Sequence, residues 1–497
     1  TCHGPQEPIA IAGHFKASGA RTNSGSMPPA IFDPPPRRAG CRDAVVIVDP
    51  FSSGKYLVFE MQRRRIPIIS VCSSRKLAPF YLRAYEAMKP HMAELIDFDD
   101  CSGVADLAAR LKKLPYALLA VMPGTESGVE LADQLAAELG MTNSNPIDLM
   151  EARKDKAEMQ DRIRQCGIPA AEQTKGSDID ALLAWARARG VYPLVAKPIK
   201  GAGSDGVFFC KSEEDIRQAH AEMIGSGRQN LFGTVIPEMA LQEFLSGEEY
   251  IVDTVSYDGS HICVAMWVYK KQRGMPWNAS AIVCEYSKMI SPEGREQDKL
   301  TEYVFRVLDA VGIRYGPCHT EIMMTPRGPI LVEVNARMHG LQGPYLIECA
   351  TGVNLASFSA DTMVADGAVF RQLVKPPFGR WPGRWLYPLE KQAYTFILLS
   401  PEQGYLKVDL KEEIMAMGLP SVIDVVVMVQ KGQYLNQTVD LASAPAVVLM
   451  VHASEEQIEG DMSQIRFREA RDLYQVAPEP PGSGGATPVG SPVLAAR

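Results

Sequence analysis

Two acidic side chains and an amide interrupt apolar stretches around residue 330. Glu321 lies in the run HTEIMM, and Glu333 and Asn335 lie in ILVEVNAR, and both runs have the composition of buried strands. A buried carboxylate without a partner is costly, so these groups are expected to hold something. Carboxylate and amide oxygens are hard ligands of the kind that Mg²⁺ or Mn²⁺ prefers.

The spacing predicts that these groups share one surface. Residues two apart on a strand face the same side, so His319 and Glu321 share a face, as do Glu333 and Asn335. The turn TPRG at 325–328 joins the two strands as a hairpin. The alternative reading is an ordinary solvated face of a half-buried hairpin, and the apolar residues of both strands argue against it.

A second segment carries residues suited to phosphate. Lys197 ends an apolar strand in PLVAKPIKGAGSDGVFF, and Gly201, Gly203 and Gly206 follow it. Glycines let the backbone approach a ligand and aim its N–H groups at phosphate, whose charge a lysine balances. The GxxxxGK[ST] pattern of a P-loop is absent. A glycine-rich hairpin with a chance lysine is the alternative.

The first part of the chain alternates strands and helices. Strands are predicted at 44–50, 66–74 and 116–124, with helices between and after them, which is typical of a parallel sheet. The loop PGTESG at 123–128 follows the carboxyl end of a strand, where such sheets place ligands. No GxGxxG motif follows a strand, so this Rossmann-like region is not expected to bind a dinucleotide.

The chain is too long for one hydrophobic core. A helix is predicted over 146–166, and a linker and a hairpin that turns at Asp258-Gly259 over 239–271. The predicted division is a disordered Gly- and Pro-rich leader at 1–42, a Rossmann-like domain at 43–145, a central domain at 146–378 with a lid at about 168–240, a small α+β domain at 379–475, and a disordered tail at 476–497.

Composition excludes several classes of protein. The net charge of −8 and the pI of about 5.6 argue against a nucleic-acid-binding or anionic-membrane surface, which needs a basic face. No apolar run approaches the length of a membrane span, and no signal peptide is visible. The ten cysteines form no CxxC pair, which predicts reduced thiols in a cytoplasmic protein.

The order of the motifs resembles the ATP-grasp superfamily. The resemblance rests on DK at 155–156, VAKPIKGAGSDGV, LQEFLSGEEY and EIMM…ILVEVNAR, and it covers about residues 43 to 475. Within the superfamily, HTEI and VEVNARMHG are similar to the L-amino-acid ligase branch, which joins free amino acids into dipeptides. The resemblance implies a Rossmann-like pre-ATP-grasp domain, an ATP-grasp domain and a small α+β C-terminal domain.

The resemblance also implies roles for residues at matching positions. Those implied for nucleotide binding are Lys156, Lys197, Gly201, Gly203, Ser204, Gly206, Glu243, Phe244, Leu245 and Glu249. Metal binding is implied for Glu321, Glu333 and Asn335, and stabilisation of the acyl-phosphate for Arg337. His319 is either a catalytic residue or a packed core histidine. Glu285 is either a substrate contact or an ordinary hairpin acid. Leu341 either lines the pocket for the first amino acid or packs under its loop.

The activity implied is dipeptide formation from ATP and two amino acids, with Mg²⁺ or Mn²⁺, through an acyl-phosphate that leaves ADP and phosphate. Small molecules are the expected partners, with no nucleic acid and no membrane, and a homodimer is compatible with the resemblance. Three alternatives stay open. They are an ATP-grasp ligase that couples a non-proteinogenic acid to an amine in natural-product biosynthesis, a carboxylase, and a non-catalytic ATP-binding protein on the same fold.

Overall fold

The computed structural model describes residues 41–201, 206–230, 232–373, 375–378, 381–383 and 385–479, which belong to one compact unit. The predicted leader and tail, and Gly203 and Ser204 of the glycine loop, therefore lie wholly or largely outside the described residues. Two strands reach into the segments predicted as leader and tail. Strand β1 begins at Arg42, and Val476–Ala477 form strand β21, whose backbone pairs with strand β17.

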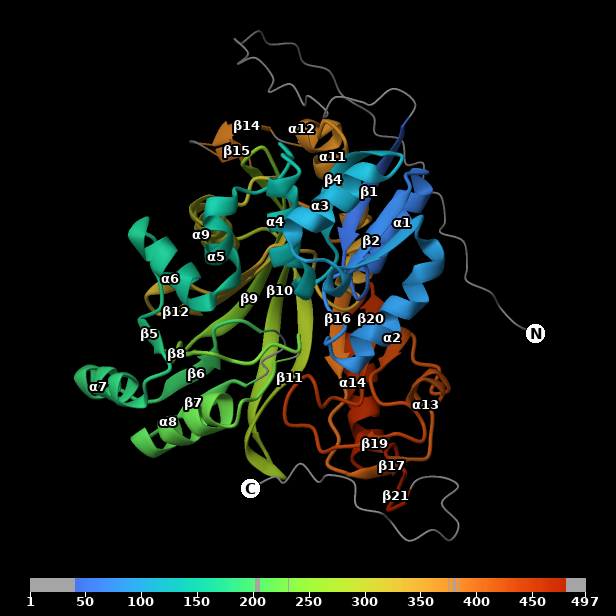
Figure 1. Ribbon diagram of the computed structural model, residues 1–497. Coiled ribbons are helices and arrows are strands. Elements are labelled where there is room, and N and C mark those ends of the chain that lie inside the picture. Colours follow the sequence, from blue (N-terminus) through green and yellow to red (C-terminus); the bar gives the residue numbers. More distant parts are fainter. Residues whose placement is uncertain are drawn as a thin grey trace. The chain divides into compact units, whose positions relative to one another are not determined.

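The N-terminal region is a parallel four-stranded sheet with helices, in the order β3-β2-β1-β4 (Figure 1). Most side chains of β1 and all of β2 are buried, which explains their continuous apolar sequences. The chain order reverses between β1 and β4, so the loops after these strands form the ligand-binding edge of such a sheet. The elements are β1 (Arg42–Val48), α1 (Gly54–Arg63), β2 (Ile68–Cys72), α2 (Pro79–Met88), η1 (Lys89–His91), β3 (Glu94–Asp97), η2 (Phe98–Asp100), α3 (Val104–Lys113), β4 (Tyr116–Pro123), η3 (Glu126–Gly128) and α4 (Val129–Glu138).

The prediction of one continuous helix over 146–166 is wrong. The segment contains η4 (Ile147–Leu149), α5 (Met150–Lys154) and α6 (Lys156–Gln165). Asp155 has an extended backbone, and its carboxylate accepts hydrogen bonds from the backbone N–H groups of Ala157 and Glu158. Asp155 is therefore the N-cap of α6, and this break places Lys156 at the first position of a helix.

The segment predicted as a lid forms a small antiparallel sheet in the order β5-β8-β6-β7. Apolar side chains of α7 and α8 share one buried cluster with this sheet, so both helices cover the same face (Figure 1). Strand β8, the last of these strands in the chain, is followed by residues 244–247, which lead into the central sheet. The elements are β5 (Gln173–Gly176), α7 (Ile179–Arg189), β6 (Leu194–Pro198), β7 (Phe208–Cys210), α8 (Glu213–His220), the π-helical η5 (Ala221–Gly225) and β8 (Met239–Glu243).

The largest sheet is antiparallel and has the order β13-β12-β9-β10-β11-β16-β20-β18. The predicted hairpin turn at Asp258-Gly259 is confirmed: both residues have positive φ, and β9 and β10 pair on either side of them. The central elements are β9 (Glu248–Tyr257), β10 (Ser260–Met275), β11 (Asn278–Ile290), α9 (Arg295–Ala310), β12 (Gly316–Thr325), β13 (Gly328–Asn335), α10 (Gly343–Thr351), α11 (Leu355–Val364), α12 (Ala368–Leu373), β14 (Lys375–Phe378) and β15 (Trp381–Gly383).

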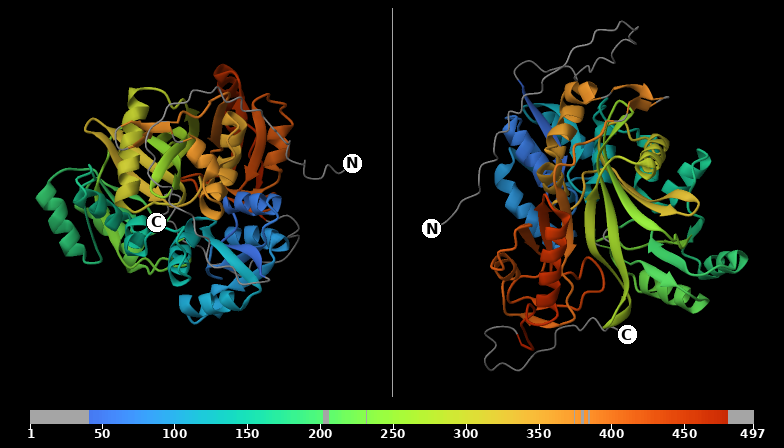
Figure 2. Two further views of the ribbon diagram at one scale, coloured as in Figure 1. Left: turned by 90° about the horizontal axis from the view of Figure 1, so that it is seen from above. Right: turned by 180° about the vertical axis from the view of Figure 1, so that it is seen from behind.

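The C-terminal region extends this sheet and also forms a separate three-stranded sheet of its own. Strand β16 pairs with β11, so the orange and red strands continue the yellow-green ones in Figure 2. The region still has an apolar cluster of its own. Its elements are β16 (Gln392–Ile397), β17 (Gly404–Leu406), α13 (Leu410–Met415), β18 (Val422–Val427), β19 (Tyr434–Leu435), β20 (Ala446–His452), α14 (Glu455–Glu469) and β21 (Val476–Ala477).

The predicted fold class is confirmed, with a parallel α/β region first and antiparallel α+β regions after it. The exact domain division stays a prediction, because the sheet runs through the boundary expected near 379. Among the described helices, none combines the length and the apolar character that crossing a membrane requires.

Candidate active site

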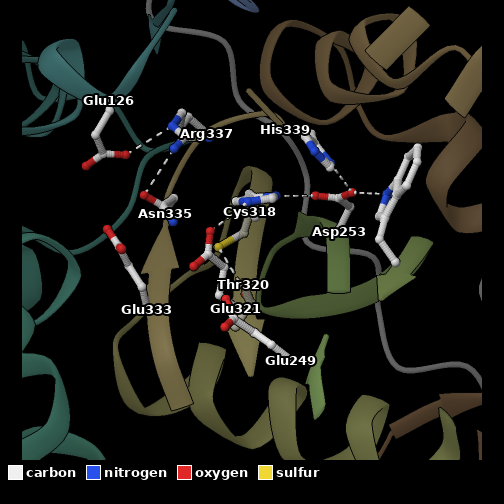
Figure 3. A network of polar contacts seen from close by, with 12 residues as sticks. Glu126, Glu249, Asp253, Cys318, Thr320, Glu321, Glu333, Asn335, Arg337 and His339 are labelled. Carbon is white, nitrogen blue, oxygen red and sulfur yellow. Dashed lines mark hydrogen bonds and ion pairs between the residues drawn. The ribbon is translucent and has the colours of Figure 1, made fainter. Parts of the chain in front are cut away.

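The two acidic metal-binding candidates lie directly opposite each other on neighbouring strands. Glu321 of β12 pairs with Glu333 of β13, and His319 pairs with Asn335. Figure 3 shows Glu321, Glu333 and Asn335 near one another, at the end of the hairpin away from its turn. The TPRG turn closes the hairpin, with Thr325 paired to Gly328. The hairpin therefore brings two carboxylates and an amide oxygen together, as their spacing predicted.

Two lysines approach this carboxylate pair from different elements. The Nζ atom of Lys156, at the start of α6, lies 3.0 Å from an oxygen of Glu333 and donates to the carbonyl of Gly201 at 2.8 Å. The Nζ atom of Lys197, on β6, donates to Gln242 at 3.0 Å. Burial, and then the charge of Lys156, lower the pKa of Lys197 to about 8. A phosphate group would favour the charged form of both lysines.

Arg337 follows the hairpin and is fixed by a residue of the N-terminal region. Its Nε donates to Glu126 at 3.0 Å, and its other N–H groups donate to the carbonyl of Met338 at 2.9 Å and the side-chain oxygen of Asn335 at 3.2 Å (Figure 3). Glu126 also accepts from Lys154 at 2.7 Å. Burial works to raise the pKa of Glu126, but the charges of Lys154 and Arg337 lower it.

Glu126 lies in the loop 123–128, after β4, at the edge where the parallel sheet reverses its order. The sequence indicated that this loop would face a ligand, but it did not identify the residue. The buried cluster of Glu126, Lys154 and Arg337 joins three parts of the chain. Its consequence is that the guanidinium has a fixed direction before any substrate binds.

A network around Asp253 was not predicted. Asp253 lies on β9, is 1% exposed, and accepts hydrogen bonds from His319 and His339 through their Nδ1 atoms, each at 2.8 Å, and from Trp267 at 3.0 Å. The Nε2 atom of His319 lies 3.4 Å from Glu321. The available signal was an acid, Asp253, inside the apolar run YIVDTVSY, which is the same kind of signal that identified Glu321.

The surroundings of the two imidazoles shift their pKa values in opposite directions. Burial works against a charged His319, but hydrogen bonds to Asp253 and Glu321 raise its pKa to about 9. Burial lowers the pKa of His339, against the attraction of the Asp253 charge, which raises it. Burial also favours a neutral Asp253, yet attraction to His339 and the hydrogen bonds from both rings hold the pKa of this carboxyl well below its usual range.

The predicted adenine and ribose contacts lie between the lid and the central sheet. Phe244 and Leu245 follow β8 directly, as a hinge would. The Glu243 carboxylate is held by Arg327 at 2.7 Å and Arg189 at 3.2 Å, and its backbone N–H donates to the carbonyl of Glu172 at 2.8 Å. These positions are compatible with the predicted roles but do not test them.

The predicted ribose acid, Glu249, is paired in this structure. Both of its oxygens accept from the Nζ atom of Lys271 on β10, at 2.6 and 2.7 Å. Burial works to lower the pKa of Lys271, but the charge of Glu249 raises it. A sugar hydroxyl could therefore reach Glu249 only alongside this ammonium group. Lys271 was not identified from the sequence, because it follows Lys270 in what reads as an ordinary polar strand end.

The remaining predicted residues are placed as follows. Glu285 is partly buried on β11, and its carbonyl accepts from Arg466 of α14 at 3.5 Å, which turns its backbone towards the C-terminal region. Leu341 lies in the loop after Arg337 and has a positive φ of 52°. Gly201 contacts Lys156 through its carbonyl, and Gly206 has a φ of 73°.

The donor set fits a hard divalent cation. Glu321, Glu333 and Asn335 supply only oxygen atoms, and the partner of Glu333 is an ammonium group that a cation could replace. No cysteine takes part, and the nearest nitrogen ligand candidate, His319, is occupied on its Nδ1 side by Asp253. These residues therefore fit Mg²⁺ or Mn²⁺ better than a soft metal.

A protein-family profile described as an ATP-grasp domain matches residues 190–344. The chain carries an ATP-grasp domain. This match takes in the lid strand with Lys197 and the hairpin with Glu321 and Glu333, so the motif-based recognition is confirmed. Outside residues 190–344, the division into domains is inferred from the fold.

Similar proteins extend the likeness over most of the chain. Dapdiamide A synthase of Enterobacter agglomerans is 28% identical over 446 residues, which is 88% of this chain and 97% of that protein. The crystal structure of L-amino acid ligase from Bacillus licheniformis has a TM-score of 0.65 at 16% identity, and the alignment covers 86% of this chain and 98% of that one. At that identity the second likeness concerns the fold alone.

A second similar structure contains a nucleotide. It is the biotin carboxylase domain dimer of Hydrogenobacter thermophilus 2-oxoglutarate carboxylase, in complex with MgADP, ADP and bicarbonate. Its TM-score is 0.56 at 16% identity, over 87% of this chain and 90% of that one. This chain therefore shares its fold with a domain that binds MgADP.

Proposed function

We propose that this protein is an ATP-dependent carboxylate–amine ligase that joins two amino acids through an acyl-phosphate and releases ADP and phosphate. The observation that carries the proposal is the pair Glu321 and Glu333, opposite each other on a buried hairpin, with Asn335 and Arg337 next to them. The similarity to dapdiamide A synthase over 88% of the chain supports it, and the fold is shared with an L-amino acid ligase.

The first step needs phosphate binding and an in-line approach. Lys156 and Lys197 would bind the phosphates of ATP, and the glycine loop after Lys197 would cover them. Bound to Glu321, Glu333 and Asn335, Mg²⁺ would neutralise phosphate charge and hold the reactants in line. A carboxylate oxygen of the first amino acid attacks the γ-phosphorus, the bond to the β-phosphate oxygen breaks, and ADP leaves.

The second step forms the amide. The neutral amine of the second amino acid attacks the acyl carbon, inorganic phosphate leaves, and the nitrogen loses a proton. Arg337, held by Glu126, would offset the negative charge that develops on the carbonyl oxygen. Since the guanidinium is already oriented by buried partners, little reorganisation is needed when that charge appears.

A second candidate is a ligase that couples a non-proteinogenic acid to an amine. The similarity to dapdiamide A synthase, which spans nearly that whole protein, favours it. It shares every step above and differs only in which acid enters. A screen for substrates should therefore include amino-acid-like acids as well as the common amino acids.

The test is to incubate the protein with ATP, Mg²⁺ and pairs of acids and amines, and to analyse nucleotides and products. Amide formation with ADP and phosphate supports the proposal, and hydroxylamine should trap an acyl hydroxamate in the absence of the amine. AMP with pyrophosphate would contradict the mechanism. Tight MgADP binding with no turnover in a broad screen would favour a non-catalytic ATP-binding protein. Light scattering of the same sample tests the predicted homodimer.

A further inference from the structure

Asp253 is shared by two histidines from different parts of the site. One carboxylate oxygen accepts from His319 Nδ1 and the other from His339 Nδ1, each at 2.8 Å, as Figure 3 shows for His339. Trp267 Nε1 also donates to the second oxygen, at 3.0 Å. An ionised carboxylate only accepts, so each imidazole must carry a proton on Nδ1. Asp253 therefore fixes the orientation of both rings.

The His319 branch leads to the metal-binding candidates. His319 lies on β12, two residues before Glu321, and its Nε2 atom is 3.4 Å from a carboxylate oxygen of Glu321. The imidazole is thus bracketed between two acids, one on β9 and one on its own strand. Residues that orient metal ligands in this way commonly affect metal affinity about 10–100-fold.

The His339 branch leads to the loop between β13 and α10. This loop, residues 336–342, carries Arg337 and Leu341. The His339 ring packs at 5.2 Å from the Trp267 ring and 4.4 Å from the His319 ring. On its other side it lies against Gly343, where a Cβ atom would come within 2.4 Å of the imidazole. The ring is therefore held by Asp253 and confined by its neighbours.

We propose that Asp253 is a positioning residue that ties the two halves of the site together, the metal-binding carboxylate Glu321 through His319 and the Arg337 loop through His339. The proposal deepens the proposed function and rests on it for the identity of the reaction. It predicts that the two histidines affect different steps of binding. The His319 branch should govern binding of metal and nucleotide, the His339 branch should govern the loop and the amino-acid substrate, and Asp253 should govern both.

The alternative for this cluster is a metal site made of Asp253, His319 and His339. Their ligand atoms are close enough to surround an ion. However, both oxygens of Asp253 already accept hydrogen bonds from nitrogen donors at ordinary distances. The carboxylate is thus satisfied by the protein itself, which favours a positioning role.

The experiment compares the variants Asp253→Asn, His319→Gln and His339→Gln with the wild-type full chain. Calorimetry measures binding of ADP in the presence of Mn²⁺, and hydrogen exchange measures protection of residues 336–343. Steady-state kinetics then gives kcat and KM for the first amino acid. Asp461→Asn is the matched control, because Asp461 is fully buried on α14 with Ser421 as its partner, remote from β9 in the fold.

We expect His319→Gln to weaken binding of ADP with Mn²⁺ about 10–100-fold and to leave exchange of the loop within twofold of wild type. His339→Gln should show the reverse, with faster exchange over 336–343 and a rise of at least about tenfold in the KM of the amino acid. Asp253→Asn should show both changes, and Asp461→Asn neither. If the two histidine variants alter the same quantities to the same extent, or if Asp253→Asn changes neither, the proposal is wrong.

These readouts separate the two proposals. Binding and exchange need no turnover, so they decide the role of Asp253 even if wild-type protein forms no amide, which would contradict only the proposed function. If Asp253→Asn does not fold, the two histidine variants still decide the matter, since separated effects support the proposal and identical effects refute it. Tight binding of Mn²⁺ alone that is lost in all three variants would establish a metal site instead.

Discussion

Glu321 and Glu333 form a directly opposed pair of carboxylates across two antiparallel strands. Like charges in this arrangement normally destabilise a sheet. Here each acid has a cationic neighbour, since Lys156 lies 3.0 Å from Glu333 and the His319 ring lies 3.4 Å from Glu321. A site for a divalent cation needs acids held close together. Until the cation binds, a nearby cationic group can balance the charge of each acid.

Replacing Glu333 by Gln should abolish turnover with little effect on folding. The change removes the repulsion from Glu321 but also the ion pair with Lys156, which keeps its hydrogen bond to the Gly201 carbonyl. Because these effects oppose each other, the free energy of unfolding should change little. We expect more than about a tenfold loss of kcat/KM, which corresponds to about 1.4 kcal/mol of barrier. The exposed Glu348 of α10 supplies the control, and Glu348→Gln should remain active. A Glu333→Gln enzyme with over a tenth of the wild-type rate would contradict the assignment.

Nucleotide binding should take up a proton near pH 8 to 9. Lys197 has a pKa of about 8 without nucleotide, because it is buried and near Lys156. Phosphate should raise that pKa, so binding at a pH above about 8 draws a proton onto Lys197, and affinity should fall as the pH rises from 8. Below about pH 7 the lysine is already charged, and no uptake is expected from it.

The measurement is calorimetry of MgADP binding in buffers of different ionisation enthalpy. The Lys197→Arg variant is the comparison, because arginine keeps its charge at these pH values. It should bind MgADP without the proton uptake that wild type shows at pH 8.5. Equal uptake in both proteins would assign the proton to another group.

The parts of the site that the sequence predicted are marked either by local spacing or by a recognisable order of motifs. Glu321, Glu333 and Asn335 lie on adjacent strands joined by a short turn, so alternation alone places them together. Lys156 and Lys197 could be recognised because motifs in a fixed order resemble the ATP-grasp pattern. The parallel N-terminal sheet could be predicted because its strands are continuous apolar runs.

The parts that were missed depend on contacts between distant segments. Glu126 meets Arg337 across 211 residues of sequence, and Asp253 meets His339 across 86. No periodicity links such residues. The break at Asp155 was missed for a different reason, since its flanking residues favour helix and only the capping hydrogen bonds of its side chain show that one helix ends and another begins.

Removing the charge of Glu126 should destabilise the protein. Glu126→Gln would leave Lys154 and Arg337 without their buried anion, and losing one partner of a buried ion pair costs about 3–5 kcal/mol. Glu213→Gln is the control, because its pair with Arg187 is solvent-exposed and should contribute little to stability. Urea unfolding of both variants checks this, and similar small losses would contradict a fixed Arg337.

Leu341 should select the size of the first amino acid. It lies four residues after Arg337, has a φ of 52°, and packs at the edge of the main apolar cluster. The next residue, Gln342, accepts a hydrogen bond from Tyr56 of α1, which fixes the end of the loop. If Arg337 contacts the reacting carboxyl group, the Leu341 side chain is near the side chain of that substrate.

Replacing Leu341 by Trp should narrow the pocket and favour small first residues such as Ala or Gly. A difference of one methylene group in an apolar pocket is worth about 1–3 kcal/mol, so the ratio of kcat/KM between a small and a large first amino acid should rise roughly tenfold or more. The measurement is that ratio in wild type and variant with the second amino acid held fixed. Leu341→Met, which nearly conserves volume, should leave the ratio within about threefold. An equal fall for both substrates in Leu341→Trp would show that Leu341 supports the loop and does not select the substrate.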